Sequence, residues 1–305
     1  MPGQSTDDDH LQPAWHPASG SSPGPRSNSA GGRIESSLDY DPAIVPIQPA
    51  ATVMLIDDRP DLHVLMVHRT AEVVFAPDSW VFPGGRVDPE DHIDDFDTLF
   101  HGLSDAEASA ILGVERGGLA WWLAACRETL EEAGVLLAAA HTEPGTGGRP
   151  GVGPTTVAQL RARLAEDESL FADLLLEHGI SLDATLVEEV ARFITPMGPP
   201  RRFDARFFVA RAPAGQEASH DRGEIVNTEW VQPSAALERW SAGEMEMMSP
   251  TVRMVACLTR YRSADEVMTA ASRRLDYQRV RVADPAGAYQ VLLPGEPGYE
   301  QAELE

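Results

Sequence analysis

The chain carries "WVFPGG" at residues 80–85 and "RETLEEAGV" at residues 127–135, and these two stretches decide how its fold is interpreted. The first ends a strand-like run in two glycines, which permit backbone angles and close approaches that other residues cannot reach. The second closes "LAWWLAACRETLEEA", residues 119–133, which the apolar periodicity predicts to be a helix. Gly134 follows as a natural C-terminal cap of that helix.

The predicted helix has an apolar stripe and an acidic side. At about 100° per residue, one stripe collects Leu119, Trp122, Leu123, Cys126, Leu130 and Ala133. Glu128, Glu131 and Glu132 fall on the other side, and a solvated acidic face is the common meaning of such a pattern. Here, however, they occupy the last turn, where the helix dipole disfavours anions by about 0.3–1 kcal/mol each. A hard divalent cation would compensate this cost, because Mg²⁺ and Mn²⁺ prefer clustered carboxylate oxygens.

Together, the two stretches resemble the signature of the Nudix hydrolases. That signature runs G, five residues, E, seven residues, then R-E-apolar-x-E-E-x-G-apolar; Gly85 matches its first glycine, and residues 127–135 match its last part. Asp91 stands where the first glutamate is usual, Thr129 replaces an apolar residue, and residues 92–126 stand where seven are usual. A long insertion in a surface loop costs little, because loop-closure entropy grows only logarithmically. The resemblance therefore implies one site with a segment looped out of its middle.

With this long insertion, the chain resembles the Nudix branch that includes the animal peroxisomal coenzyme A diphosphatases, over roughly residues 48–262. The resemblance implies an α/β fold, the Nudix α/β/α sandwich, in which a mixed β-sheet lies between helices. The expected organisation is a disordered tail at 1–45, a Nudix domain at 46–275 with an insert at about 92–117 and a helical addition at about 140–190, and a C-terminal extension at 276–305.

The remaining elements are expected from local pattern. We predict one helical run from about Thr156 to His178. Strands are predicted in "AATVMLIDD", "LHVLMVHR", "ARFITP", "RFDARFFVA" and "NTEWVQP", and helices in "SPTVRMVACLTRY" and "ADEVMTAASRR".

The resemblance also implies roles for the residues of the site. Gly85, Glu128, Glu131 and Glu132 would be the metal ligands, Gly85 through its carbonyl, for Mg²⁺ or Mn²⁺. Arg127 would act in catalysis by pairing with a carboxylate and fixing its rotamer. Two carboxylates remain candidates for accepting a proton from the attacking water, Glu131 and Glu224. A solvated loop acid is an equally good interpretation of Glu224.

Arginines are the candidates for holding a substrate phosphate, because the guanidinium fork suits it. These are Arg69, Arg201, Arg202 and Arg206. For Arg201, Arg202 and Arg206, an ion-paired sheet face around Asp204 is the alternative.

The substrate prediction depends on a second motif, found in coenzyme A-cleaving Nudix enzymes. "LMVHRTAEVVFAPDSWVFPGG" keeps Arg69 and the spacing to Phe82, but has Val74 for a second arginine and Asp78 for a glycine. Coenzyme A or acyl-coenzyme A is the leading substrate. ADP-ribose, a dinucleotide or a nucleotide sugar is the alternative. A catalytically silent nucleotide-binding regulator is less favoured, because the glutamate set of residues 127–135 is intact.

Composition narrows the setting and the partners. The net charge of −24 repels a phosphate backbone, so the expected partner is a small nucleotide substrate and not a nucleic acid. The sequence contains no run of about 18 apolar residues, so no membrane span is predicted. The start "MPGQSTDDDH" is unlike a signal peptide, and the end "QAELE" is no S-K-L-type address, so a cytoplasmic setting is expected. A homodimer is left open.

Overall fold

The structure is a computed structural model. It describes residues 44–73, 76–138, 152–195, 199–220 and 223–272, the short strands 281–283 and 290–292, and the single residues 41, 298 and 301. The predicted tail at 1–45 and extension at 276–305 lie mostly outside the described residues, as do Val74 and the start of the helical addition.

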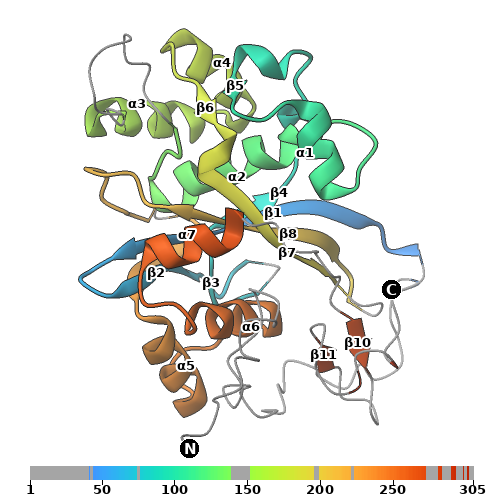
Figure 1. Cartoon of the computed structure of the whole chain (residues 1–305), viewed down its shortest axis with the longest axis vertical. Helices are drawn as coiled ribbons and strands as arrows, with labels where there is room; N and C mark the ends of the chain where they lie inside the picture. The colour runs from blue at the N-terminus through green and yellow to red at the C-terminus, as the bar shows by residue number, and fades with distance from the viewer. Residues whose placement is uncertain are drawn as a thin grey trace, which may run out of the picture.

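The centre of the molecule is a sheet of seven strands, and this sheet is mixed, as predicted (Figure 1). β1 and β8 run parallel, and every other neighbouring pair in this sheet is antiparallel. The strand order is β3-β2-β1-β8-β7, with β4 paired to β1 and β9 paired to β2. The strands are β1 (Ile47–Asp58), β2 (Leu62–Arg69), β3 (Trp80–Val81), β4 (Gly84–Arg86), β7 (Val187–Ile194), β8 (Arg202–Arg211) and β9 (Ile225–Val231). Outside this sheet, β5 (Phe100–His101) pairs with β6 (Leu182–Asp183), and β10 (Arg281–Ala283) with β11 (Gln290–Leu292).

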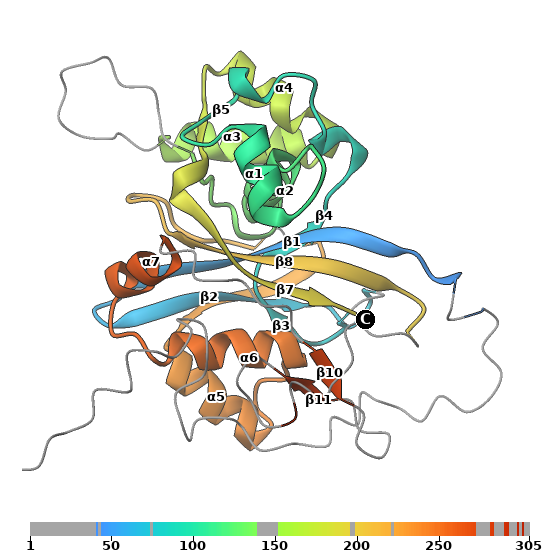
Figure 2. The ribbon, with the colours of Figure 1, turned by 45° about the vertical axis from the view of Figure 1, so that its right-hand side comes forward.

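Helices cover both faces of the sheet, which makes the fold the predicted α/β/α sandwich (Figures 1 and 2). One face carries α1 (Asp105–Leu112), α2 (Leu119–Ala133), α3 (Pro154–Leu164) and α4 (Phe171–Glu177). The other face carries α5 (Pro233–Ala242) and α6 (Ser249–Leu258), and α7 (Ala264–Ser272) joins the apolar cluster of that side. Among the described residues, no helix combines the length and the apolar character that crossing a bilayer requires.

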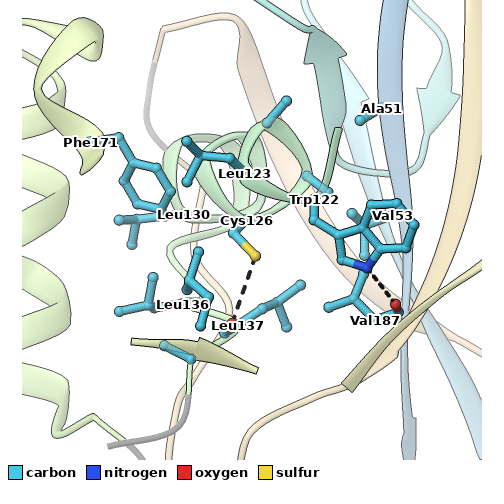
Figure 3. Packing of buried hydrophobic residues seen from close by; sticks show 14 of the residues in the cluster. Ala51, Val53, Trp122, Leu123, Cys126, Leu130, Leu136, Leu137, Phe171 and Val187 are labelled. Atoms are coloured by element: carbon cyan, nitrogen blue, oxygen red, sulfur yellow. Dashed lines mark hydrogen bonds between the residues drawn. The ribbon is translucent and has the colours of Figure 1, made fainter. Parts of the chain in front are cut away.

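Alternation along the strands builds two cores. In β1, Val53 and Leu55 face the α2 layer, whereas Met54 and Ile56 face the α5–α6 layer. Figure 3 shows α2 above the first core, where the Trp122 indole donates to Val187 O at 2.8 Å. The nearby Cys126 thiol is also buried; burial, with a smaller contribution from Asp91, raises its pKa to about 12. One face of the sheet therefore provides the apolar surface on which α2 packs.

The helical run predicted from Thr156 to His178 is wrong as one continuous helix. α3 ends at Leu164, and α4 begins only at Phe171, after a short 3-10 turn at Glu168–Leu170. The Asp167 carboxylate accepts hydrogen bonds from the backbone N–H of Ser169 at 3.1 Å and from its hydroxyl at 2.6 Å. Local side-chain bonds of this kind compete with helix continuation. Strand β4, the short pair β5–β6 and helix α5 were not predicted either.

The insert packs against the core of the domain and is not merely looped out from it. Its Leu99, Ala108 and Leu112 are buried in the same core as α2. The Asp105 carboxylate, on α1, accepts hydrogen bonds from Gly117 N at 2.9 Å and Leu119 N at 3.0 Å, which are donors at the start of α2. The insert thus caps the amino end of this helix, a contribution that the prediction of a surface loop missed.

Candidate active site

The acidic end of α2 lies against the glycine turn, so the two stretches do meet. Gly84 N donates to Glu132 Oε2 at 2.9 Å. A side-chain carbon on Gly85 would overlap the Glu128 carboxylate, and one on Gly84 would overlap the backbone of β1. Gly84 also has a φ of +154°, which disfavours other residues. Both glycines are therefore required for the turn to approach the two carboxylates this closely.

The acidic side of α2 is not solvated, contrary to the common meaning of its pattern. Glu132 is only 7% exposed, and the Glu128 and Glu131 side chains are 12% and 22% exposed. The helix is covered by the β4 turn on this side and by the core on the other. Three carboxylates are thus held together and largely shielded from solvent.

Arg127 is the buried cation of this cluster. Its Nε and Nη2 form a fork on Asp91, at 3.0 and 2.9 Å, and Nη2 also donates to Arg86 O at 3.0 Å. Its Nη1 donates to Glu128 at 2.9 Å and to Glu131 at 3.4 Å. Burial opposes the charge of this guanidinium, but the hydrogen bonds and charges of Asp91, Glu128 and Glu131 outweigh it and raise the pKa. Asp91, whose role the sequence left open, anchors Arg127.

The carboxylates themselves are destabilised as anions. Burial raises the pKa of Glu128 well above its ordinary value; Arg127 opposes the rise, and Glu132 and Glu131 add to it. Burial likewise raises the pKa of Glu131 to about 7, against the opposing effect of Arg127 and with a contribution from Glu168. One arginine is thus insufficient to neutralise the cluster.

A second arginine joins the far side of the cluster. Arg69, at the end of β2, donates to Glu132 Oε1 at 3.2 Å and to Glu224 Oε2 at 2.6 Å. Glu224 lies just before β9 with a side chain that is 63% exposed. Two sequence candidates from distant segments, Arg69 and Glu224, are therefore brought to the acidic end of α2.

Comparison with known proteins identifies the family. Residues 108–258 match the family described as NUDT19 Nudix domain. The chain belongs to the Nudix hydrolases. The acyl-coenzyme A diphosphatase NUDT19 of Gallus gallus is 26% identical over 79% of this chain and 74% of its own length. That of Homo sapiens is 28% identical over 67% of this chain and 62% of its own length, less than two thirds.

A solved relative confirms the fold. The NUDIX hydrolase from Alicyclobacillus acidocaldarius superposes with a TM-score of 0.62 at 27% identity, over 74% of this chain and 97% of its own. The expected Nudix α/β/α sandwich and the expected hydrolase class are therefore confirmed for this Nudix hydrolase.

Nudix hydrolases generally use divalent metal ions, and the carboxylates of this Nudix hydrolase fit such an ion. The glutamate cluster gathers hard oxygen donors, and the positive charge beside it is too small to stabilise all of them as anions. A bound cation would supply the missing charge. Within the described part of the chain, no three acidic, histidine or cysteine side chains are already arranged as a metal site. Their oxygens are turned to Arg127, Arg69 and Gly84 N instead.

Three of the predicted phosphate-binding arginines lie on or beside β8 in this Nudix hydrolase. Arg206 is 1% exposed; it donates to Leu112 O at 2.8 Å and lies 3.5 Å from Glu189. Arg202 is 8% exposed and donates to Thr195 O at 3.0 Å. Both are buried and donate to backbone carbonyls of neighbouring segments, whereas Arg201 is exposed.

The ion-paired sheet face around Asp204 is present. Its carboxylate accepts a fork from Arg192 at 2.6 and 2.5 Å, and Arg206 lies 3.7 Å away. The ion-paired alternative therefore describes Arg206, whereas Arg202 donates to Thr195 O.

We expect the metal-free protein to lose stability as the pH rises from about 5 to about 7. A carboxyl whose folded-state pKa is raised binds its proton more tightly in the folded than in the unfolded chain, so ionisation favours unfolding. For Glu131 the window runs from the ordinary value near 4.5 to about 7. The measurement is the free energy of unfolding at pH 5, 6, 7 and 8 in chelator. The stability advantage of Glu131→Gln over wild type should grow up to about pH 7 and level off above; a constant difference would contradict the prediction.

Proposed function

We propose that this Nudix hydrolase cleaves the pyrophosphate bond of coenzyme A or of its thioesters, with Mg²⁺ or Mn²⁺ as cofactor. The observation that carries the substrate class is the match to relatives named acyl-coenzyme A diphosphatases over most of the described domain. Arg69 supports it, because it is the arginine of the coenzyme A motif and lies at the acidic end of α2. The intact glutamate set favours an enzyme over a silent nucleotide binder.

In this proposal, the carboxylates of Glu128 and Glu132 and the Gly85 carbonyl would hold the metal ion. When bound, such an ion neutralises pyrophosphate charge and makes a water a better nucleophile. Glu128 must lose its proton to bind, so metal uptake should release protons. Arg127, anchored by Asp91, keeps the Glu128 carboxylate in place.

We infer that Glu131 accepts the proton from the attacking water. In the metal-free fold, burial raises its pKa to about 7, and a carboxylate made more basic in this way is a better proton acceptor. Glu224 is the alternative base. Its carboxylate is already bonded to Arg69, which favours a role in holding that arginine beside Glu132.

The substrate experiment compares coenzyme A, dephospho-coenzyme A, ADP-ribose and NADH on one preparation with Mg²⁺ and with Mn²⁺. Coenzyme A should yield 3′,5′-ADP and 4′-phosphopantetheine, identified by mass, because water adds across the pyrophosphate and the 3′-phosphate is spared. Dephospho-coenzyme A should have a roughly tenfold lower kcat/KM if one charge-assisted contact of about 1.5 kcal/mol is lost. Arg69 and Arg201 are the proposed sources of that contact.

Excess chelator should abolish turnover, and undiminished turnover would contradict the metal-dependent mechanism. A preference of more than tenfold for ADP-ribose or NADH would contradict the coenzyme A proposal. The enzyme would then be a diphosphatase for ADP-ribose, dinucleotides or nucleotide sugars.

A further inference from the structure

Helix α3, in the helical addition, reaches back to the carboxyl end of α2 (Figure 1). The contact is made by Arg161, whose Nε and Nη2 donate to the backbone carbonyl of Glu131 at 3.1 and 2.6 Å. Its Nη1 donates to Ser219 Oγ at 2.9 Å, in the loop between β8 and β9. One half-buried guanidinium therefore joins three segments that are far apart in the sequence.

The contact completes the carboxyl end of α2. The last four carbonyls of a helix have no partner within it. Here Gly134 N donates to Leu130 O at 3.0 Å, and Ser219 N donates to Ala133 O at 2.8 Å. The Arg161 guanidinium donates to Glu131 O. Gly134 fits closely between them, since a side-chain carbon there would lie 2.7 Å from Arg161 Nη1. Two of these carbonyls thus depend on groups outside the Nudix signature.

The positive charge of Arg161 also lies beside a concentration of negative charge. The carboxyl end of a helix carries partial negative charge, and here it carries three glutamates as well. Arg127 and Arg69 approach the glutamate carboxylates from other sides, whereas Arg161 binds the backbone of the turn that carries Glu131 and Glu132. Arg161 therefore acts on where this turn lies, and not on a carboxylate directly.

The loop between β8 and β9 is tied to the same end of α2. The buried Gln216 amide accepts from Leu136 N at 2.8 Å and donates to Leu136 O at 3.1 Å. Ser219 adds the second attachment, and the loop continues to Glu224, whose carboxylate meets Arg69. The loop and the helix end therefore form one frame, in which Arg161 bridges the two parts.

We propose that Arg161 is a positioning residue for the hydrolysis. It fixes the last turn of α2 relative to the β8–β9 loop, so that the carboxylates of Glu131 and Glu132 keep their places beside Glu128. The proposal rests on the proposed function of these glutamates in metal binding and proton transfer. It assigns the helical addition to the catalytic frame, as support for the metal-binding turn.

The test compares Arg161→Met, Arg161→Lys and Arg163→Met. Methionine keeps an unbranched apolar stem and removes every donor; lysine keeps the charge but lacks the fork. Arg163 is the matched control, because it lies on the same helix, has a side chain that is 49% exposed, and pairs only loosely with Glu177 at 3.9 Å. The readouts are Mn²⁺ affinity by electron paramagnetic resonance without substrate, kcat and KM for the hydrolysed nucleotide, and Tm in chelator.

Arg161→Met should weaken Mn²⁺ binding and lower kcat by roughly 10-fold to 100-fold, the usual effect of removing a support for metal ligands. KM should change less than kcat, and the protein should remain folded. Arg161→Lys should recover part of both losses, and Arg163→Met should match wild type. If kcat and Mn²⁺ affinity both fall while the protein stays folded, Arg161 does more than stabilise the fold.

Wild-type Mn²⁺ affinity and kcat in folded Arg161→Met would overturn the proposal, as would equal losses in Arg163→Met. If Arg161→Met does not fold, Arg161→Lys decides, and wild-type values for this variant would overturn the proposal. A failed coenzyme A assignment is distinguishable, since the Mn²⁺ measurement needs no substrate and the kinetics can use whichever nucleotide wild type cleaves. If wild type binds no Mn²⁺, both proposals fail.

Discussion

Glu128→Gln is expected to lower kcat by about 100-fold or more, because in the proposed mechanism it removes a metal-ligand charge beside the reacting phosphate. The same change should leave the metal-free protein as stable as wild type or more stable. The raised pKa of Glu128 means that its charge is unfavourable in the metal-free fold, and Gln keeps the size of the side chain. The measurements are kcat at saturating Mg²⁺ and Tm in chelator.

The control for this prediction is Glu238→Gln, which removes one negative charge from an exposed position on α5, across the sheet from α2. It should change neither kcat nor Tm appreciably. If Glu128→Gln instead lowers Tm strongly and keeps activity, the carboxylate has a structural role as a partner of Arg127 and is not a metal ligand.

Arg127→Met is expected to destabilise the fold by about 3–5 kcal/mol, as when one partner of a buried ion pair is removed. Asp91, 2% exposed, would then lose the fork that it accepts, and Arg86 O and Glu128 would lose a donor as well. Chemical denaturation in chelator measures this loss. Activity should also fall, because Glu128 and Glu131 lose the group that orients them.

A double-mutant cycle gives this prediction its control. Asp91→Asn combined with Arg127→Met should cost clearly less than the sum of the two single changes, because each single change leaves the other partner buried and unpaired. Arg163→Met, on an exposed side chain, should stay within about 0.5 kcal/mol of wild type. Additive losses, or a loss below about 1 kcal/mol for Arg127→Met, would mean that Asp91 and Arg127 are not energetically coupled.

The central elements of the fold were predictable because their signals are local. Residues 119–133 form the predicted helix, and Gly134 ends it in the left-handed conformation at a φ of 66°. The runs predicted to be strands form β1, β2, β8 and β9, whereas β7 begins at Val187, four residues before the predicted run. The break between α3 and α4 was missed, because the apolar pattern continues through it while Asp167 competes for the backbone.

The sequence by itself determined which groups the site contains: two adjacent glycines, three glutamates in one helical turn and an adjacent arginine. It could do so because residues three and four apart on a helix share a face. Only the tertiary structure decided how these groups are supported. Asp91 meets Arg127 across 36 positions, Arg69 meets Glu132 across 63, and Arg161 meets the carbonyl of Glu131 across 30. Such partners are chosen by the packing of whole elements, and no local periodicity encodes which arginine will reach which oxygen.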